Sequence, residues 1–562
     1  MIAATLLPLL VSIQGGVAAP DDLHEWVGRF TADRDALGRR HDVEYSPDRA
    51  RAMRAFYEAE RAELGALDAT KLGLEARIDS VLADGEIAYA LARLERDARA
   101  LAELEPLLPF ASTIWALHGA RARIETPDPR ESAEALVRLK DEIAKVREAT
   151  PEASKQVALR AARAIDRLRD LLSGWHDHFA GYDPLFTWWT AKPFEEARSK
   201  LDDYRAWLRK DRVGIEEGKD EPIVGDPIGR EALLVDLAHE RIAYTPEELL
   251  AIAERESTWC ETELKKASAE MGLGDDWKAA LERVKQDFVE PGKQPELVKE
   301  LAEEAVRFLE ERKLVTLPPL AKEVWRLEMI SPEGQKTAPF FLGGEVIQVA
   351  YPTDAMEHAD KLMSLRGNNV HFARATVFHE LIPGHHLQGF MNERYRPYRG
   401  VFSTPFWTEG WALYWEMRFW DLGWPKSPED RVGMLFWRMH RSARILFSLG
   451  FHLGNLTPEQ CVEMLVERVG HERANAEAEV RRSLNGSYPP LYQIAYMTGA
   501  LQFRALHEEL VTSGKLTERA FHDAILQGGN MPIELVRARL TGKVPERGSP
   551  PAWVFAGEPS GK

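Results

Sequence analysis

From about residue 21 to residue 327, apolar side chains recur at intervals of three and four, which limits the possible folds more than any other feature. One such run comprises Leu94, Ala98, Leu101, Leu104 and Leu108. Ala, Leu, Glu and Arg, which favour helices, dominate this part of the chain. Helical spacing resumes near residue 354 and continues to about residue 540. We therefore predict a predominantly helical, all-α protein.

One segment departs from this pattern. Residues 340–351 contain β-forming side chains interrupted by Gly343 and Gly344, which predicts a small β-hairpin. A short strand beside a candidate active site can offer backbone groups to an extended peptide.

The length of 562 residues exceeds what one small core supports, so we expect more than one region. We predict an N-terminal helical region over residues 20–330 and a catalytic, metal-binding helical region over 331–545. Residues 546–562 are rich in Pro and Gly, and we expect a flexible tail there.

Residues 1–19 combine an apolar stretch with a run of small residues, as in a secretory signal peptide, although a basic start is missing. This predicts an exported protein, periplasmic or secreted; the alternative is a cytoplasmic protein with an apolar tail. Cys260 and Cys461 are too few for a Cys-rich metal site, and we expect two buried free thiols.

The net charge of −17 argues against nucleic acid or an anionic membrane as the main partner, because both require a basic surface. After residue 19 no run of about 18 uncharged apolar residues occurs, so we expect no stable membrane insertion once a signal is removed. The sequence does not indicate an oligomeric state.

Residues 378–388 read Phe-His-Glu-Leu-Ile-Pro-Gly-His-His-Leu-Gln and place imidazoles beside a carboxylate. In the common zinc-hydrolase helix the second His follows the first by four positions, but that position is Pro383 here. On a straight helix His385 lies about 120° round from His379. His386 returns to the same face about 10 Å further along the axis. Neither arrangement holds one metal ion on a straight helix.

Pro383 offers a solution, because its ring clashes with the carbonyl group of His379 and it has no N–H group to donate. Gly384 tolerates unusual backbone angles. We predict a bulge that absorbs two extra residues within one helical segment and brings a later His back beside His379. Either His385 or His386 can then be the second ligand.

Glu409 is the candidate third ligand. Thr404 and Pro405 predict the start of a helix that runs to Gly423 and places Glu409 one turn in. Glu416 lies seven residues later on the same face, where it can orient a ligating His or form a salt bridge.

These segments resemble the bacterial domain-of-unknown-function family 885 (DUF885), whose members are presumed metallopeptidases. The family pattern His-Glu-x-x-Pro-Gly-His-His-Leu-Gln matches residues 379–388. Its Glu-Gly-Trp-Ala-Leu-Tyr segment matches 409–414, and its Phe-His-Asp-x-Ile-Leu helix matches 521–526. The resemblance is strongest from about 335 to 540.

The family is in turn similar to the gluzincin metallopeptidases, in which a downstream Glu is the third ligand. In several of these a Gly precedes the second His, which favours His385 over His386. The resemblance implies a deep cleft and a role for Tyr496 in stabilising an oxyanion, against a buried core tyrosine as the alternative. His452 matches a family His, and Arg482 an Arg that can hold a substrate carboxylate or form an ion pair.

We therefore predict a metallopeptidase in which His379, His385 and Glu409 bind one Zn²⁺ and Glu380 is the general base. Fold-level analogy suggests short peptide substrates. Two alternatives use the same residues: a non-haem iron enzyme, and a catalytically inactive helical binding protein. Glu380, the acid beside His379, favours hydrolysis, since neither alternative needs a base at that position.

Overall fold

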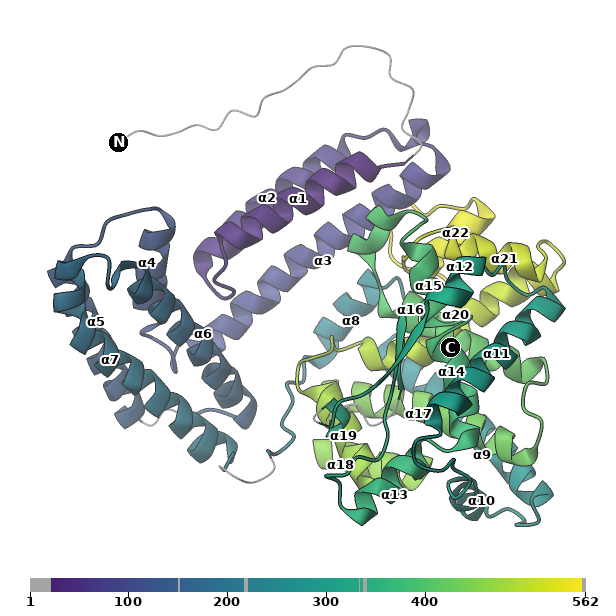
Figure 1. The fold of residues 1–562 in the computed structure, drawn as a ribbon. Coiled ribbons are helices and arrows are strands. Elements are labelled where there is room, and N and C mark those ends of the chain that lie inside the picture. The colour runs from purple at the N-terminus through teal and green to yellow at the C-terminus, as the bar shows by residue number, and fades with distance from the viewer. Residues whose placement is uncertain (1–21, 150–151, 217–220, 333, 337–340, 558–562) are drawn as a thin grey trace.

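A computed structural model describes residues 22–149, 152–216, 221–332, 334–336 and 341–557 of the chain. The predicted signal segment 1–19 lies outside these residues. The described part confirms the all-α prediction, since helices account for most of it (Figure 1).

The helices of the first part of the chain are α1 (His24–Arg40), α2 (Pro47–Gly65), α3 (Leu74–Leu104), α4 (Ala111–Ala122), α5 (Pro129–Ala149), α6 (Lys155–Phe179), α7 (Pro184–Trp207), α8 (Gly229–His239), α9 (Pro246–Glu270), α10 (Trp277–Val284), α11 (Gln294–Arg312) and α12 (Pro319–Val324). Those of the second part are α13 (His358–Gly367), α14 (Val370–Glu380), α15 (His385–Asn392), α16 (Pro405–Asp421), α17 (Pro428–His452), α18 (Pro458–Met464), α19 (Arg473–Leu484), α20 (Tyr492–His507), α21 (Glu518–Leu526) and α22 (Ile533–Thr541).

A small sheet interrupts the helices between α12 and α13. Strands β2 (Phe341–Leu342) and β3 (Val346–Val349) pair antiparallel around the Gly-Gly turn, as the predicted hairpin requires. A third strand, β1 (Arg326–Met329), pairs parallel with β3 and was not predicted. The strand order β1-β3-β2 leaves β2 at an edge of the sheet.

The helices pack around two main cores. Apolar side chains from α4 to α7 form one core, and these helices lie together as a separate lobe (Figure 1). The second, larger core combines side chains of α1 to α3 and α8 to α11 with those of α14 to α22. The predicted boundary near residue 330 therefore falls inside one continuous core.

Segment 546–557 is held against the body, although the sequence predicts a flexible tail there. The guanidinium group of Arg547 donates to the carbonyl oxygen of Leu67 at 2.7 Å. The carboxylate of Glu534 accepts from the backbone N–H of Trp553 at 3.0 Å. Hydrogen bonds to the loop after α2 and to α22 hold a segment whose composition alone indicates mobility.

Cys260 and Cys461 are both buried free thiols, as predicted. Burial raises the pKa of each thiol to about 12. Within the described part of the chain, no helix is both long and apolar enough to span a bilayer.

Paired glycines let α16 and α20 cross at close range. A Cβ atom on Gly499 would lie 2.2 Å from the carbonyl oxygen of Phe406 and 2.8 Å from the Cα of Gly410. A Cβ on Gly410 would in turn lie 2.5 Å from the Cα of Gly499. Only glycine fits at either position, and the close crossing brings Glu409 on α16 next to the tyrosines of α20.

Replacing Gly499 with alanine should therefore destabilise the protein by at least about 2 kcal/mol, because the new methyl group forces two backbones apart. Gly85→Ala is the matched control, since Gly85 lies inside α3 with open space at its Cβ position. That change should be neutral or slightly stabilising. Chemical denaturation of both variants measures the difference, and equal stability would contradict the packing argument.

Candidate metal and catalytic site

The motif of residues 379–388 is divided between two helices. Helix α14 ends at Glu380 and α15 begins at His385, with the cis Ile382–Pro383 peptide bond between them. The prediction of a bulge inside one helix was wrong, because Pro383 ends the first helix instead of distorting it. The Trp411 indole N–H donates to the Pro383 carbonyl oxygen at 2.8 Å and holds the connection against α16.

Gly384 is required here by close approach. Its φ of −78° is open to any residue, but a Cβ atom would lie 1.7 Å from the carbonyl oxygen of His379. The backbone N–H of Gly384 donates to the Phe378 carbonyl oxygen at 3.0 Å. The chain thus folds back onto the end of α14, which places His385 beside His379.

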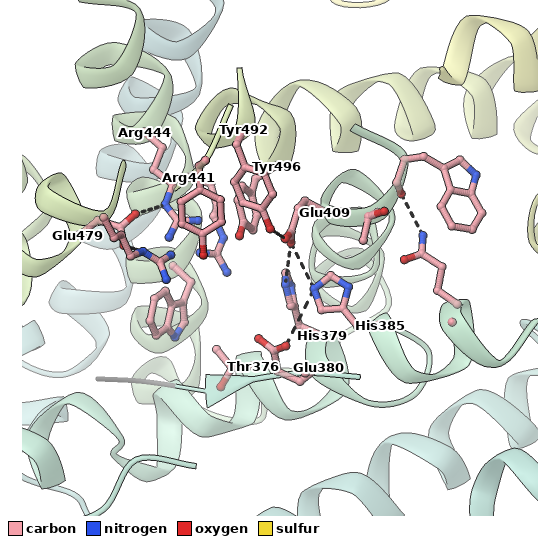
Figure 2. Close-up of a pocket in the computed structure, with 18 of the residues that line it drawn as sticks. Thr376, His379, Glu380, His385, Glu409, Arg441, Arg444, Glu479, Tyr492 and Tyr496 are labelled. Atoms are coloured by element: carbon pink, nitrogen blue, oxygen red, sulfur yellow. Dashed lines mark hydrogen bonds and ion pairs between the residues drawn. The ribbon is translucent and has the colours of Figure 1, made fainter. Parts of the chain in front are cut away.

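The structure brings together His379, His385 and Glu409, the three predicted metal ligands (Figure 2). One nitrogen or oxygen atom from each lies within 4.8 Å of the others. The Glu409 Oε2 atom is 3.2 Å from His385 Nε2 and 3.8 Å from His379 Nε2. Ligand atoms of a tetrahedral zinc site lie about 3.3 Å apart, given bonds of about 2.0–2.1 Å. The separations therefore suit one zinc ion.

The surroundings of these atoms also fit a cation. Glu409 Oε2 is buried and accepts no hydrogen bond from the described residues. Burial alone would raise the pKa of Glu409, but the imidazoles of His385 and His379 hold it well below its usual value. A buried carboxylate oxygen that faces two imidazoles and has no donor of its own is what a divalent ion would complete.

Glu416 orients the first histidine. Its Oε1 atom accepts from His379 Nδ1 at 2.6 Å, which directs Nε2 towards Glu409. Burial tends to lower the pKa of His379, but the nearby carboxylates of Glu409 and Glu416 raise it to about 9. Both roles weighed for Glu416 are present: the hydrogen bond to the candidate ligand and an ion pair with Arg441 at 3.8 Å.

Replacing Glu416 with glutamine should weaken zinc binding by about 10–100-fold, since the amide no longer fixes the tautomer or basicity of His379. Competition with a chromogenic chelator measures the affinity. Glu393→Gln, an exposed change at the end of α15, is the control and should bind as the parent does. Unchanged affinity in the Glu416 variant would show that its hydrogen bond is not needed.

Glu380 is the last residue of α14, and its Oε2 atom lies 4.0 Å from His385 Nε2 on the pocket wall. Gly343 of the hairpin turn packs directly on it. A Cβ at that position would lie 2.2 Å from Glu380 Oε2. The lack of a side chain at Gly343 therefore lets the hairpin turn approach the carboxylate closely.

Two tyrosines of α20 face the same pocket. Tyr496 stacks nearly parallel to His379, with ring centroids 6.4 Å apart. Tyr492 donates its hydroxyl hydrogen to Glu409 Oε1 at 2.5 Å. Burial is the main cause that raises the pKa of both phenols above the usual value, so both remain hydrogen-bond donors at neutral pH. The sequence argument named Tyr496 and missed Tyr492, although the spacing of four on one helix face indicates it.

Two predicted residues lie elsewhere. His386 Nε2 donates to the carbonyl oxygen of Ala321 at 2.7 Å, so this ring turns away from the candidate ligands. His452, at the end of α17, does not line the pocket, and burial lowers its pKa to about 4. An adjacent His on a helix points about 100° away, which explains why His386 diverges from His385.

Arg482 does line the pocket, and its Nε atom pairs with Glu479 Oε2 at 2.7 Å. Arg441 and Arg444 of α17 also reach the pocket and were not predicted. Their signal in the sequence is the series Arg438, Arg441 and Arg444, spaced by three among the apolar residues of α17, since buried arginines need a partner or a role.

The pocket that joins these groups has a volume of about 390 Å³. Candidate metal ligands and Glu380 form one part of its wall, and the arginines and tyrosines form another (Figure 2). This volume is in the range of small-molecule sites.

The fold and site together define a helical protein with a buried two-histidine, one-glutamate cluster and an adjacent carboxylate. The profile of the family described as "Bacterial protein of unknown function (DUF885)" matches residues 28–540. The chain belongs to this family. A comparison with curated protein sequences finds no match.

Similar solved structures include two putative lipoproteins. One is a putative lipoprotein of unknown function from Shewanella oneidensis, with a TM-score of 0.68 and 17% identity. The other is a putative lipoprotein from Colwellia psychrerythraea, with a TM-score of 0.56 and 14% identity. Each alignment covers 93% of this chain and 100% of the other. At these identities the similarity concerns the fold.

Proposed function

We propose that the protein is a zinc-dependent metallopeptidase that hydrolyses short peptides. The observation that carries this proposal is the position of Glu380, which lies 4.0 Å from one candidate ligand and on the wall of the same pocket. A carboxylate next to a metal cluster is placed to act as a base on water.

His379, His385 and Glu409 would hold the zinc ion. When bound, the ion would supply a Lewis acid that polarises a carbonyl group and acidifies a water molecule. A site of three protein ligands leaves a position for water or substrate, as catalytic zinc sites do.

The chain's own groups would perform the proton transfers. Glu380 takes a proton from the attacking water and delivers it to the leaving amine. Tyr496 keeps its phenolic hydrogen at neutral pH, so it can donate a hydrogen bond to the oxygen that gains negative charge. Glu416 keeps His379 in the tautomer that presents Nε2 to the pocket.

The surroundings favour a short peptide as the substrate. Strand β2 is an edge strand that ends at Leu342, so its backbone can pair with an extended chain. The next residue, Gly343, packs against Glu380. The pocket of about 390 Å³ accommodates a few residues and excludes a folded protein.

Incubation of the purified, zinc-loaded protein with a mixed peptide library tests the proposal, with product masses as the readout. We expect cleavage that stops when the metal is chelated and returns with zinc. Full metal occupancy without cleavage of any peptide would contradict a peptidase function. Recovery of activity with iron(II) but not zinc would favour the iron enzyme.

We also propose that the protein is exported. The N-terminal apolar segment supports this, as does the description of both similar structures as putative lipoproteins. Fractionation of bacteria that express the full chain should recover it outside the cytoplasm. Retention in the cytoplasm with an intact N-terminus would contradict export.

A further inference from the structure

The pocket wall beyond Tyr496 carries an excess of positive charge. Arg441, Arg444 and Arg482 line it, and within the described residues one carboxylate, that of Glu479, pairs closely with them. Arg444 Nε donates to Glu479 Oε1 at 2.7 Å, and Arg482 approaches the other oxygen at the same distance. Burial tends to raise the pKa of Glu479, but Arg444 and Arg482 lower it to about 2. Glu479 is therefore ionised, and one carboxylate faces three guanidinium groups.

Other charged groups do not remove this excess. Glu416 lies 3.8 Å from Arg441, farther than the 2.7 Å pairs at Glu479, and its short contact, at 2.6 Å, is with His379. His440 and His471 lie near Glu479, and burial lowers the pKa of each, so both are neutral.

Two of the guanidinium groups have unused donors. Arg441 is 5% exposed and Arg444 is 3% exposed. Among the described residues, the buried Nε of Arg441 and Nη1 of Arg444 find no hydrogen-bond acceptor. Buried charged donors without partners are costly unless a ligand supplies the acceptor. Both residues line the pocket, which indicates the side from which an acceptor can approach them.

We infer that these three arginines form a subsite for a substrate carboxylate, next to the catalytic groups. This inference rests on the proposed peptidase function and adds a substrate class to it. Guanidinium groups bind carboxylates through paired, charge-assisted hydrogen bonds, which suits a peptide C-terminus or an acidic side chain.

The subsite lies close to the bond that would be cleaved. The Cζ atoms of Arg441 and Arg444 lie 4.7 Å and 4.4 Å from the centroid of the Tyr496 ring. That ring in turn stacks with His379. An extended peptide advances about 3.3–3.6 Å per residue. A carboxylate bound here therefore lies only a few residues from the scissile bond, and the enzyme would release short fragments from the C-terminal end of its substrates.

Paired peptide libraries, identical except for a free-acid or an amidated C-terminus, test this. We expect free acids to be cleaved with a kcat/KM on the order of 100-fold higher than amides, with products of one or two residues from the C-terminus. A third series, amidated but ending in Asp or Glu, separates the two sources of the carboxylate. Faster cleavage of that series than of neutral amides would assign the subsite to acidic side chains.

Arg482→Gln is the main variant, because its side chain is 20% exposed and its loss disturbs folding least. It should lower kcat/KM for carboxylate substrates on the order of 10- to 100-fold, and the loss for neutral amides should be much smaller. Arg482→Lys should not restore the parent value, since an ammonium group cannot form the paired bonds. The control is Arg481→Gln, because Arg481 does not line the pocket and donates to the backbone oxygen of Glu221.

Binding supplies a readout without turnover. In the Glu380→Gln background, calorimetry should show tighter binding of a free-acid tripeptide than of its amide, and Arg482→Gln should abolish the difference. Equal cleavage and equal binding of acids, neutral amides and acidic amides would overturn the subsite and leave the peptidase proposal standing. No cleavage of any series by the zinc-loaded protein would overturn the peptidase proposal, and the inference with it.

Discussion

Replacing Glu409 with glutamine should remove zinc from the protein and abolish hydrolysis. The amide keeps the volume of the side chain and can still accept from Tyr492, but it removes the negative charge that faces His379 and His385. Two neutral imidazoles are then left, which is fewer than the three protein ligands of catalytic zinc sites. The affinity should fall by more than the 10–100-fold expected for removing an outer hydrogen bond.

Two measurements check this result. Elemental analysis after dialysis against buffered zinc should give about one ion per parent chain and close to none for the variant. Zinc should raise the unfolding temperature of the parent, because a ligand that binds only the native state stabilises it, and should not raise that of the variant. A variant that retains one ion per chain would show that Glu409 is not a ligand.

Replacing Glu380 with glutamine should lower turnover without removing the metal, unlike the change at Glu409. Metal content should be unchanged, because Glu380 is not part of the three-residue cluster. Turnover should fall by about 10²–10⁴, the usual contribution of a general acid or base. Glutamine occupies the same space against Gly343 but cannot take a proton from water.

Glu345→Gln is the matched control for this variant. It makes the same chemical change two residues after Gly343, on an exposed side chain that pairs with Arg326 across the sheet. Its turnover and metal content should equal those of the parent. Full activity of the Glu380 variant, with zinc bound, would eliminate the mechanism, whereas loss of zinc from that variant would mean that Glu380 belongs to the metal site.

Local signals predicted much of the fold. Thr404 caps α16 as expected, and its side chain accepts from the backbone N–H of Phe406. Strand β1 was missed because its residues, Arg326 to Met329, favour helices, and pairing with β3 decides their conformation. The division into cores was also missed, because it depends on contacts between helices that are distant in sequence.

The candidate site shows the same limit. The sequence indicated a metal cluster of His379, His385 and Glu409 with Glu380 beside it, and the structure brings these side chains together. The sequence did not predict that Pro383 would end the helix, and it left His385 and His386 as alternatives until a family pattern favoured the first. Tyr492 and the two arginines of α17 carry local signals in the sequence, but they join the site through the packing of α16, α17 and α20, which no local pattern encodes.

The hydrogen bond from Tyr492 to Glu409 has a consequence for the choice of ion. It occupies Oε1, so the carboxylate has one oxygen left to share, beside two nitrogen donors. Hard cations such as Ca²⁺ require six or more oxygen atoms, and Mg²⁺ favours oxygen in an octahedral shell. A donor set with two imidazoles and a single oxygen disfavours both and suits borderline transition metals. By donating to Oε1, the phenol of Tyr492 thus limits the number of oxygen ligands at the site and disfavours hard cations.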